Sequence, residues 1–306
     1  MSNQLKLSVS PHIHSGRSTR RIMLDVLIAL LPATVAGAVI FGLRSLLVVA
    51  VTVAACVGFE ALFNLIAKNP IPVGDLSAAV TGLLLALNLP ANIPLWQCVV
   101  GALFAIVVVK GLFGGLGANP VNPAITARVF MLVAFASLTK AAFPVDSVSS
   151  ATPLASEEAT SLMDLFLGNH GGAIGETCAV ALLLGGVYLL VRRVITWHIP
   201  VAFVGTVFLT SFLMEGMSAT AALAAILSGG LLIGAIFMAT DYVTSPATPW
   251  GKIIFGLGAG LITFLIRYFG SYPEGVSFAI LFMNIVTPYI TSWTRRRIFG
   301  KGGSKA

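Results

Sequence analysis

The residues that could carry chemistry include a polar segment that lies between two long apolar halves of the chain. It reads Asp146-Ser-Val-Ser-Ser-Ala-Thr152-Pro153, so small side chains surround one threonine hydroxyl. Pro153 biases Thr152 towards extended backbone, which makes its hydroxyl a good acceptor for a modifying enzyme. No histidine or lysine lies nearby in the sequence to activate it, so we do not expect Thr152 to be a catalytic nucleophile. An ordinary polar loop has the same spacing, and the residues alone leave both interpretations open.

A second polar cluster precedes an apolar run. The segment 117–124 reads Gly-Ala-Asn-Pro-Val-Asn-Pro-Ala and contains Asn119 and Asn122. Either asparagine can cap a helix that has Pro123 in its first turn. Arg128 follows Ala124 by one turn on the same helical face.

Three acidic residues, Asp25, Glu60 and Asp241, fall near the ends of apolar runs. Carboxylates at membrane depth are costly and usually belong to ion or proton pathways, whereas a carboxylate at the membrane surface needs no such role. Asp241 is the strongest candidate because it lies beside a proline-interrupted element. The three cysteines are isolated and the four histidines show no ligand spacing, so no metal site is predicted.

The elements that position these residues are predicted to lie in a membrane. Of the 306 residues, 57% are hydrophobic and 9% are charged, and the mean hydropathy is +0.97. Soluble domains carry about 25% charged residues, so this composition excludes a soluble enzyme and a disordered chain. The basic residues form no continuous face, which excludes a nucleic-acid partner and leaves the lipid bilayer as the expected surrounding.

A helix needs about 20 apolar residues to cross the hydrocarbon core, and the apolar runs predict ten spans. These are residues 22–43, 45–67, 75–90, 95–114, 123–141, 177–194, 199–214, 219–240, 252–269 and 275–294. With this count, all of the 18 basic residues except Arg44, Lys140 and Arg267 fall on the side of the two tails. Because positive charge marks the cytoplasmic side, both termini are predicted inside and residues 142–176 outside.

The two halves of the chain resemble each other. Residues 82–96 and 234–250 each run from a short apolar helix into a Pro-Ala element that ends at tryptophan, and residues 121–125 match 276–280. Five spans per half is an odd number, so the copies are predicted to be inverted, as in transport folds.

We therefore predict an all-α integral membrane protein with Pro-interrupted short helices. Its predicted parts are a cytoplasmic tail (1–21), a first five-helix repeat (22–141), an external loop (142–176), a second five-helix repeat (177–294) and a basic cytoplasmic tail (295–306).

The loop sequence resembles the flavinylation motif, Asp-x-x-Ser/Thr-Gly-Ala-Thr/Ser, of a family of membrane subunits. The family contains the D subunit of the Rnf ion-translocating ferredoxin:NAD oxidoreductase and the B subunit of the sodium-translocating NADH:quinone reductase. The resemblance covers nearly the whole chain, including residues 117–124 and 238–241, and the short N-terminal tail favours the Rnf branch.

The resemblance implies FMN joined to Thr152 through a phosphoester bond that a separate flavin transferase makes. The recognition segment would then hold Asp146, Ser149, Ser150 and Ala151. Ser150 stands where the family usually has glycine, and we expect attachment to survive because serine is also small.

The resemblance also implies a second, non-covalent flavin, thought to be riboflavin, near Asn119 and Asn122. An asparagine amide both donates and accepts hydrogen bonds, which suits the imide edge of a flavin. Arg128 would either favour the anionic reduced flavin there or extend its charge to the inner surface.

The implied function is electron transfer between ferredoxin and NAD, coupled to Na⁺ or H⁺ movement across the bacterial cytoplasmic membrane. The implied partners are the other Rnf subunits: the G flavoprotein, the A and E membrane proteins, and the B and C proteins. Two alternatives stay open: the quinone-reductase B subunit, and a channel or transporter for a small solute, which an inverted repeat predicts equally well.

Overall fold

The computed structural model describes residues 18–70, 73–135, 161–270 and 275–295. The first half comprises α1 (Thr19–Phe41), α2 (Leu43–Ile66), the short 3₁₀ turn η1 (Val73–Asp75), α3 (Ser77–Leu87), α4 (Leu95–Leu103), η2 (Phe104–Gly111) and α5 (Pro123–Ala134). The second comprises α7 (Ala179–Val191), α8 (His198–Met214), α9 (Ala219–Leu227), α10 (Leu231–Ile233), η4 (Gly234–Met238), α11 (Pro249–Phe269) and α12 (Val276–Thr294). The short helix α6 (Leu162–Leu167) precedes α7 and lies inside the predicted external loop.

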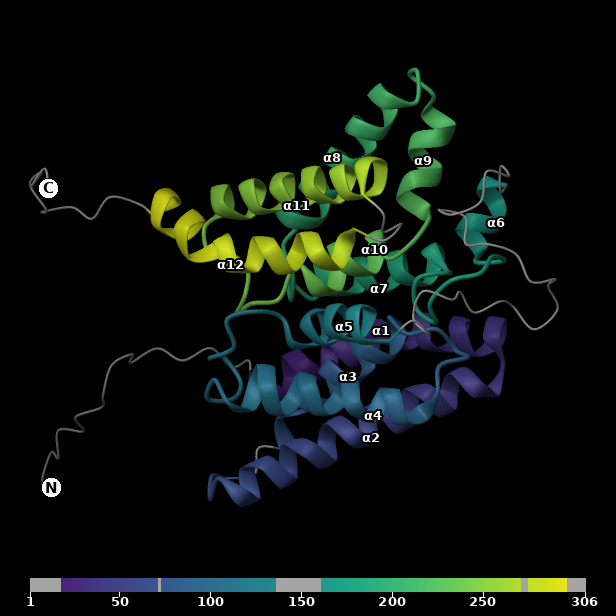
Figure 1. The fold of residues 1–306 in the computed structure, drawn as a ribbon. Coiled ribbons are helices and arrows are strands. Elements are labelled where there is room, and N and C mark those ends of the chain that lie inside the picture. The colour runs from purple at the N-terminus through teal and green to yellow at the C-terminus, as the bar shows by residue number, and fades with distance from the viewer. Residues whose placement is uncertain (1–17, 71–72, 136–160, 271–274, 296–306) are drawn as a thin grey trace, which may run out of the picture.

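The described helices lie in two stacked groups, with α1–α5 in one and α7–α12 in the other (Figure 1). Each of the ten predicted spans contains helical residues. Four helices, α1, α2, α11 and α12, are long and apolar enough to cross a membrane alone. A fifth span is formed if α9 and the following helix 231–238, which are bent by 68° at a short break, are counted as one. The chain is therefore a multi-pass membrane protein, and its other apolar helices have 10–17 residues.

Local sequence explains where the helices begin and end. The Ser18 side chain caps α1 at the Arg21 amide, and Gly42 ends α1 with φ +76°, a backbone conformation that favours glycine. Thr248 caps α11, whose first residue is Pro249. The helix that starts at Leu95 continues through residues 104–111 as a π-helix, a form often found at functional sites.

Small residues bring the helices close together. A Cβ atom on Gly185 of α7 would clash with the carbonyl oxygen of Ala29 in α1, so only glycine allows this contact between the two halves. In α11, Cβ atoms on Gly256 and Gly260 would lie 3.0 and 2.9 Å from backbone oxygens of α8. Such close backbone contacts are typical of helix pairs in membranes, where lipid gives no hydrophobic drive for association.

Candidate functional site

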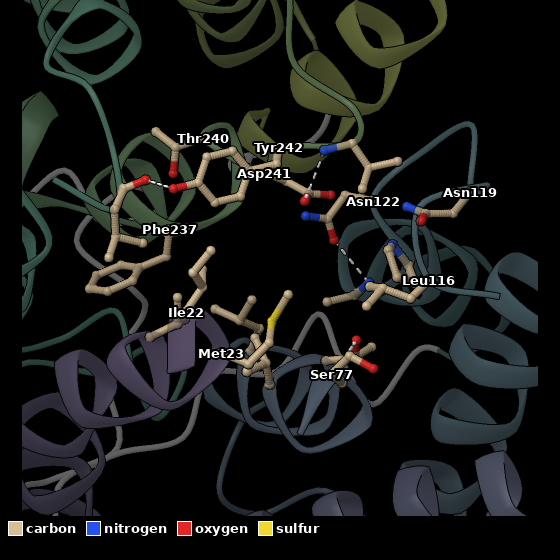
Figure 2. A pocket seen from close by; sticks show the side chains of 18 of the residues that line it. Ile22, Met23, Ser77, Leu116, Asn119, Asn122, Phe237, Thr240, Asp241 and Tyr242 are labelled. Carbon is tan, nitrogen blue, oxygen red and sulfur yellow. Dashed lines mark hydrogen bonds between the residues drawn. The ribbon is translucent and has the colours of Figure 1, made fainter. Parts of the chain in front are cut away.

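The central feature of the site is a cavity between the two halves of the chain, lined by residues of both. Its apolar wall is formed by Met23 and Val26 of α1, Leu84 of α3, Leu189 of α7 and Phe237 of η4. Figure 2 shows the polar side: Asn119, Asn122, Thr240 and Asp241 surround the opposite part of the cavity. The cavity thus joins an apolar surface to a few polar groups, which is typical of a site for an organic ligand.

Asn122 holds this wall in place through both atoms of its amide. Its Oδ1 accepts hydrogen bonds from the amides of Ala124 (3.0 Å) and Ile125 (3.3 Å), so it is the N-cap of α5 as predicted. Its Nδ2 donates to the carbonyl oxygen of Met238 at 3.2 Å and links α5 to the second half. Asn119 does not cap the helix; its Nδ2 donates to the carbonyl of Val121 at 3.0 Å.

Asp241 closes the turn that follows η4. Its carboxylate accepts from the amide of Val243 at 3.4 Å and from the hydroxyl of Thr244 at 3.2 Å. Burial raises the pKa of Asp241 above its usual value, and these hydrogen bonds oppose that shift. The Tyr242 hydroxyl donates to the carbonyl of Val194, which ties the turn after α7 to the same wall.

Arg128 does not line this cavity and does not reach the protein surface. It is buried, and its Nη1 donates to Oδ1 of Asn88 at 2.5 Å, while Nη2 lies 3.8 Å from Oε2 of Glu176. Asn88 in turn donates to the carbonyl of Leu84 and contacts the Met238 sulfur. Arg128 thus belongs to a polar network behind the cavity, and the sequence reasoning missed Asn88 and Glu176 as its partners.

Glu60 forms a buried ion pair with a residue that the sequence analysis did not single out. The Lys110 ammonium lies 2.5 Å from Glu60 Oε1 and also donates to the Ser77 hydroxyl at 2.5 Å. The Ser77 hydroxyl donates to Asp75 at 2.6 Å, which extends the network. Lys110 lines the central cavity and also a second, polar cavity that Glu60 and Asn64 line.

The signal that could have pointed to Lys110 was a lone cation inside an apolar run. A buried ammonium needs a charged partner, so Lys110 implied an acid on a neighbouring helix.

Asp25 connects the two halves at the edge of the bundle. It accepts from the Tyr188 hydroxyl at 3.0 Å and forms an ion pair with Arg192 at 3.1 Å, both at the end of α7. Asp25 does not line the central cavity, although its neighbour Val26 does. The structure therefore does not gather Asp25, Glu60 and Asp241 into one cluster, and no group of three or more potential metal-ligating acids, histidines or cysteines occurs among the described residues.

The predicted attachment segment lies outside the described residues. This holds for Asp146, Ser149, Ser150, Ala151 and Thr152, so the structure gives no geometry for them.

A multi-pass helical fold with a cavity between its halves, bordered by buried ion pairs, defines an integral membrane protein with an internal polar site. The sequence model of the NQR2, RnfD, RnfE family matches residues 6–300. The chain therefore belongs to the NQR2, RnfD, RnfE family.

Similar proteins come from several bacteria. The chain is 47% identical to the D subunit of the Na⁺-translocating ferredoxin:NAD⁺ oxidoreductase complex of Acetobacterium woodii, over 97% of this chain and 96% of that protein. It is 40% identical to the D subunit of the proton-translocating ferredoxin:NAD⁺ oxidoreductase complex of Clostridium ljungdahlii, over 97% of both chains. It is 35% identical to the D subunit of the ion-translocating oxidoreductase complex of Citrobacter koseri, over 96% of this chain and 99% of that protein.

Proposed function

We propose that this chain is the D subunit of an Rnf-type ion-translocating ferredoxin:NAD⁺ oxidoreductase complex in the bacterial cytoplasmic membrane. The observation that carries the proposal is the 47% identity to a protein of that name over nearly the full length of both chains. The relatives at 47% and 40% identity are named for different ions, sodium and protons. Similarity therefore supports ion coupling but does not select the ion.

Within this function, Thr152 is the attachment site for FMN on the outer side of the membrane. The support is the match of residues 146–152 to the flavinylation motif. The test is in-gel fluorescence of the full chain, co-expressed with a flavin transferase and denatured. We expect a fluorescent band in the wild type and in Thr160→Ala, a control in the same loop, and no band in Thr152→Ala. A wild-type chain without covalent flavin would refute this assignment.

The central cavity is the site for the second, non-covalent flavin. The support is the lining, which joins a large apolar surface to a few polar groups from both halves of the chain. The apolar wall at Met23 and Phe237 fits the ring system, and the polar groups near Asn119 and Asp241 fit its imide edge. A bound flavin would supply reversible electron acceptance, while these residues would bind and orient it. Asn122 would act indirectly because both ends of its amide already hold α5 and Met238.

This second site is tested by flavin content in the Thr152→Ala background, where covalent FMN is absent. We expect flavin to co-purify with that chain and its amount to fall when Asn119→Leu is added. Asn69→Leu, which changes an exposed asparagine outside this cavity, should leave the amount unchanged. Equal flavin content in both variants would exclude the cavity as the site.

The ion pathway includes the acids Glu60 and Asp241, with Asp25 as the weakest candidate. Glu60 and Asp241 border cavities that meet at Lys110, and Oε2 of Glu60 has no hydrogen-bond partner among the described residues. Asp25 instead has an ion-pair partner, Arg192, at the edge of the bundle. Sodium uptake or proton uptake by the whole complex in vesicles is expected to fall in Glu60→Gln, whereas uptake at the wild-type rate would contradict the role of Glu60.

The proposed topology has ten spans in two inverted repeats, both termini inside and residues 142–176 outside. This proposal is supported by the packing of corresponding helices of the two halves, α1 with α7 and α5 with α12, which is the packing expected beside a pseudo-two-fold axis. A reporter that is active only outside the cell, fused at Asn169, should be active, and inactivity there would overturn the orientation.

The two alternatives give different results in the whole complex. Reduction of a quinone by NADH, without a requirement for ferredoxin, would favour the quinone-reductase B subunit. Solute uptake without any bound flavin would favour a channel or transporter.

A further inference from the structure

A third hollow, distinct from the central cavity and from the polar cavity at Glu60, lies behind α7. It is an open groove between α7 and α8, with α9, α10 and η4 beside it. All of its lining residues are apolar or glycine, among them Val187 and Leu190 of α7, and Val204 and Phe208 of α8. Such a groove in a membrane protein faces hydrocarbon and fits a long aliphatic chain.

One end of this groove lies at a level that aromatic residues mark as a membrane surface. Trp197 precedes α8, Trp250 is in the first turn of α11 and Trp293 is in the last turn of α12; all three are exposed, at 57%, 73% and 76%. Hydrogen bonds join the helix ends that carry these tryptophans. Lys252 of α11 donates to Thr196, just before α8, at 3.1 Å, and Thr248 bonds Thr294 at the end of α12 at 2.5 Å. Tryptophan is enriched where lipid headgroups meet hydrocarbon.

The same end carries positive charge. The Lys252 ammonium is held at Thr196, next to Ile195, which lines the groove. Arg193 is exposed and lies two residues before Ile195 in the same turn. Residues 177–214 contain no acid, and Asp25, which reaches this turn from α1, pairs with Arg192. Arg193 and Lys252 thus form the cationic rim, which complements a phosphate group.

From this end the groove follows α8 into the hydrocarbon region. Its lining includes Pro200 and Phe208, which are eight residues apart, or about 12 Å along a helix at 1.5 Å per residue. An aliphatic chain can lie along this length while a phosphate stays at the level of the tryptophans.

We propose that this groove is a binding site for one anionic phospholipid. Its phosphate lies at Lys252 and Arg193, and an acyl chain lies between α7 and α8 against Gly205. The site is separate from the central cavity, although Ile195 contributes to both walls. The lipid would support the turn 194–197, which Tyr242 joins to the cavity wall.

The test is native mass spectrometry of the detergent-purified full chain, titrated with phosphatidylglycerol or with phosphatidylcholine of the same acyl chains. We expect one phosphatidylglycerol to bind at least tenfold more tightly than phosphatidylcholine. Arg193→Gln and Lys252→Gln should each weaken phosphatidylglycerol on the order of fivefold and leave phosphatidylcholine unchanged. Equal affinities of the two lipids for the wild type would overturn the proposal.

Filling the groove gives an independent readout. A Cβ on Gly205 meets no atom within 4 Å, so Gly205→Leu can fold and place its side chain in the groove, where it should weaken both lipids. Gly58 of α2 has the same open space at a different place, so Gly58→Leu is the matched control and should bind both lipids normally. Unchanged lipid binding in Gly205→Leu would refute the site. So would photo-crosslinking from Val201 in the whole complex that captures another subunit and no lipid.

Discussion

The buried pair of Glu60 and Lys110 allows a quantitative prediction for stability. Both residues are almost completely buried, at 3% and 4% exposure, and the ammonium lies 2.5 Å from the carboxylate. Removing one partner leaves the other charge buried without its counter-charge, which costs about 3–5 kcal/mol; the hydrogen bond from Lys110 to Ser77 places Glu60→Gln at the lower end of this range. We therefore expect Lys110→Met and Glu60→Gln each to lower the free energy of unfolding by that amount.

The double variant should recover much of this loss. With both charges absent, no uncompensated ion remains in the interior, and replacing a buried pair by neutral residues is often close to neutral. The double variant should then lose less stability than either single variant. The coupling between the two substitutions would therefore be at least the cost of one of them, about 3–5 kcal/mol.

The measurement is reversible unfolding of the purified chain in mixed micelles of increasing denaturing detergent, followed by tryptophan fluorescence. Arg192→Gln is the comparison, because the Arg192 side chain is 48% exposed and water can replace its contact with Asp25. Its effect should be well below that of either buried substitution. If the double variant lost as much stability as the sum of the single variants, the pair would not be desolvated and the reasoning would fail.

Three further predictions concern packing, capping and pH. Gly185→Val should lower the thermal midpoint and cost about 2–3 kcal/mol of stability, because the new side chain meets the carbonyl oxygen of Ala29. Gly58→Val is the control, since its side chain faces open space and should leave the midpoint unchanged. Asn122→Ala should lower the free energy of unfolding by about 1 kcal/mol through loss of the α5 cap. Asn122→Asp should keep the cap and that part of the stability. If both variants lowered the thermal midpoint equally, the cap would not be the cause. Burial lowers the pKa of His170 below 6.5, so below pH 6.5 the unfolded chain binds more protons than the folded chain. The stability contributed by His170 should therefore be present above pH 6.5 and decrease as the pH falls below it. A His170→Asn variant with the same dependence of stability on pH would contradict this.

The sequence alone predicted much of the framework of this protein. Apolar runs predicted an all-helical membrane protein, because burial in lipid requires long stretches without charge. Of the ten predicted spans, four described helices, or five with the bent pair, are long and apolar enough to cross a membrane. The Asn122-Pro123 pair predicted where α5 begins, since capping depends on a few neighbouring residues. The resemblance of the loop and of residues 117–124 led to the family that the comparison of the whole chain then confirmed.

The partners of the buried charges could not be predicted in this way. Lys110 pairs with Glu60 across 50 residues, and Arg128 bonds Asn88 across 40. Each choice depends on which helix faces meet, and this is set by close contacts such as that of Gly185 with Ala29. Hydropathy records only how apolar a segment is, not which neighbour it packs against.

The sequence by itself thus determined that the chain lies in a membrane, where its helices begin and which residues could carry chemistry. Only the tertiary structure decided that Asn119, Asn122 and Asp241 border one cavity while Arg128 lies behind it. The physical reason is that hydrophobic burial and capping act over one helix, whereas a cavity and its ion pairs exist only where helices from both halves meet.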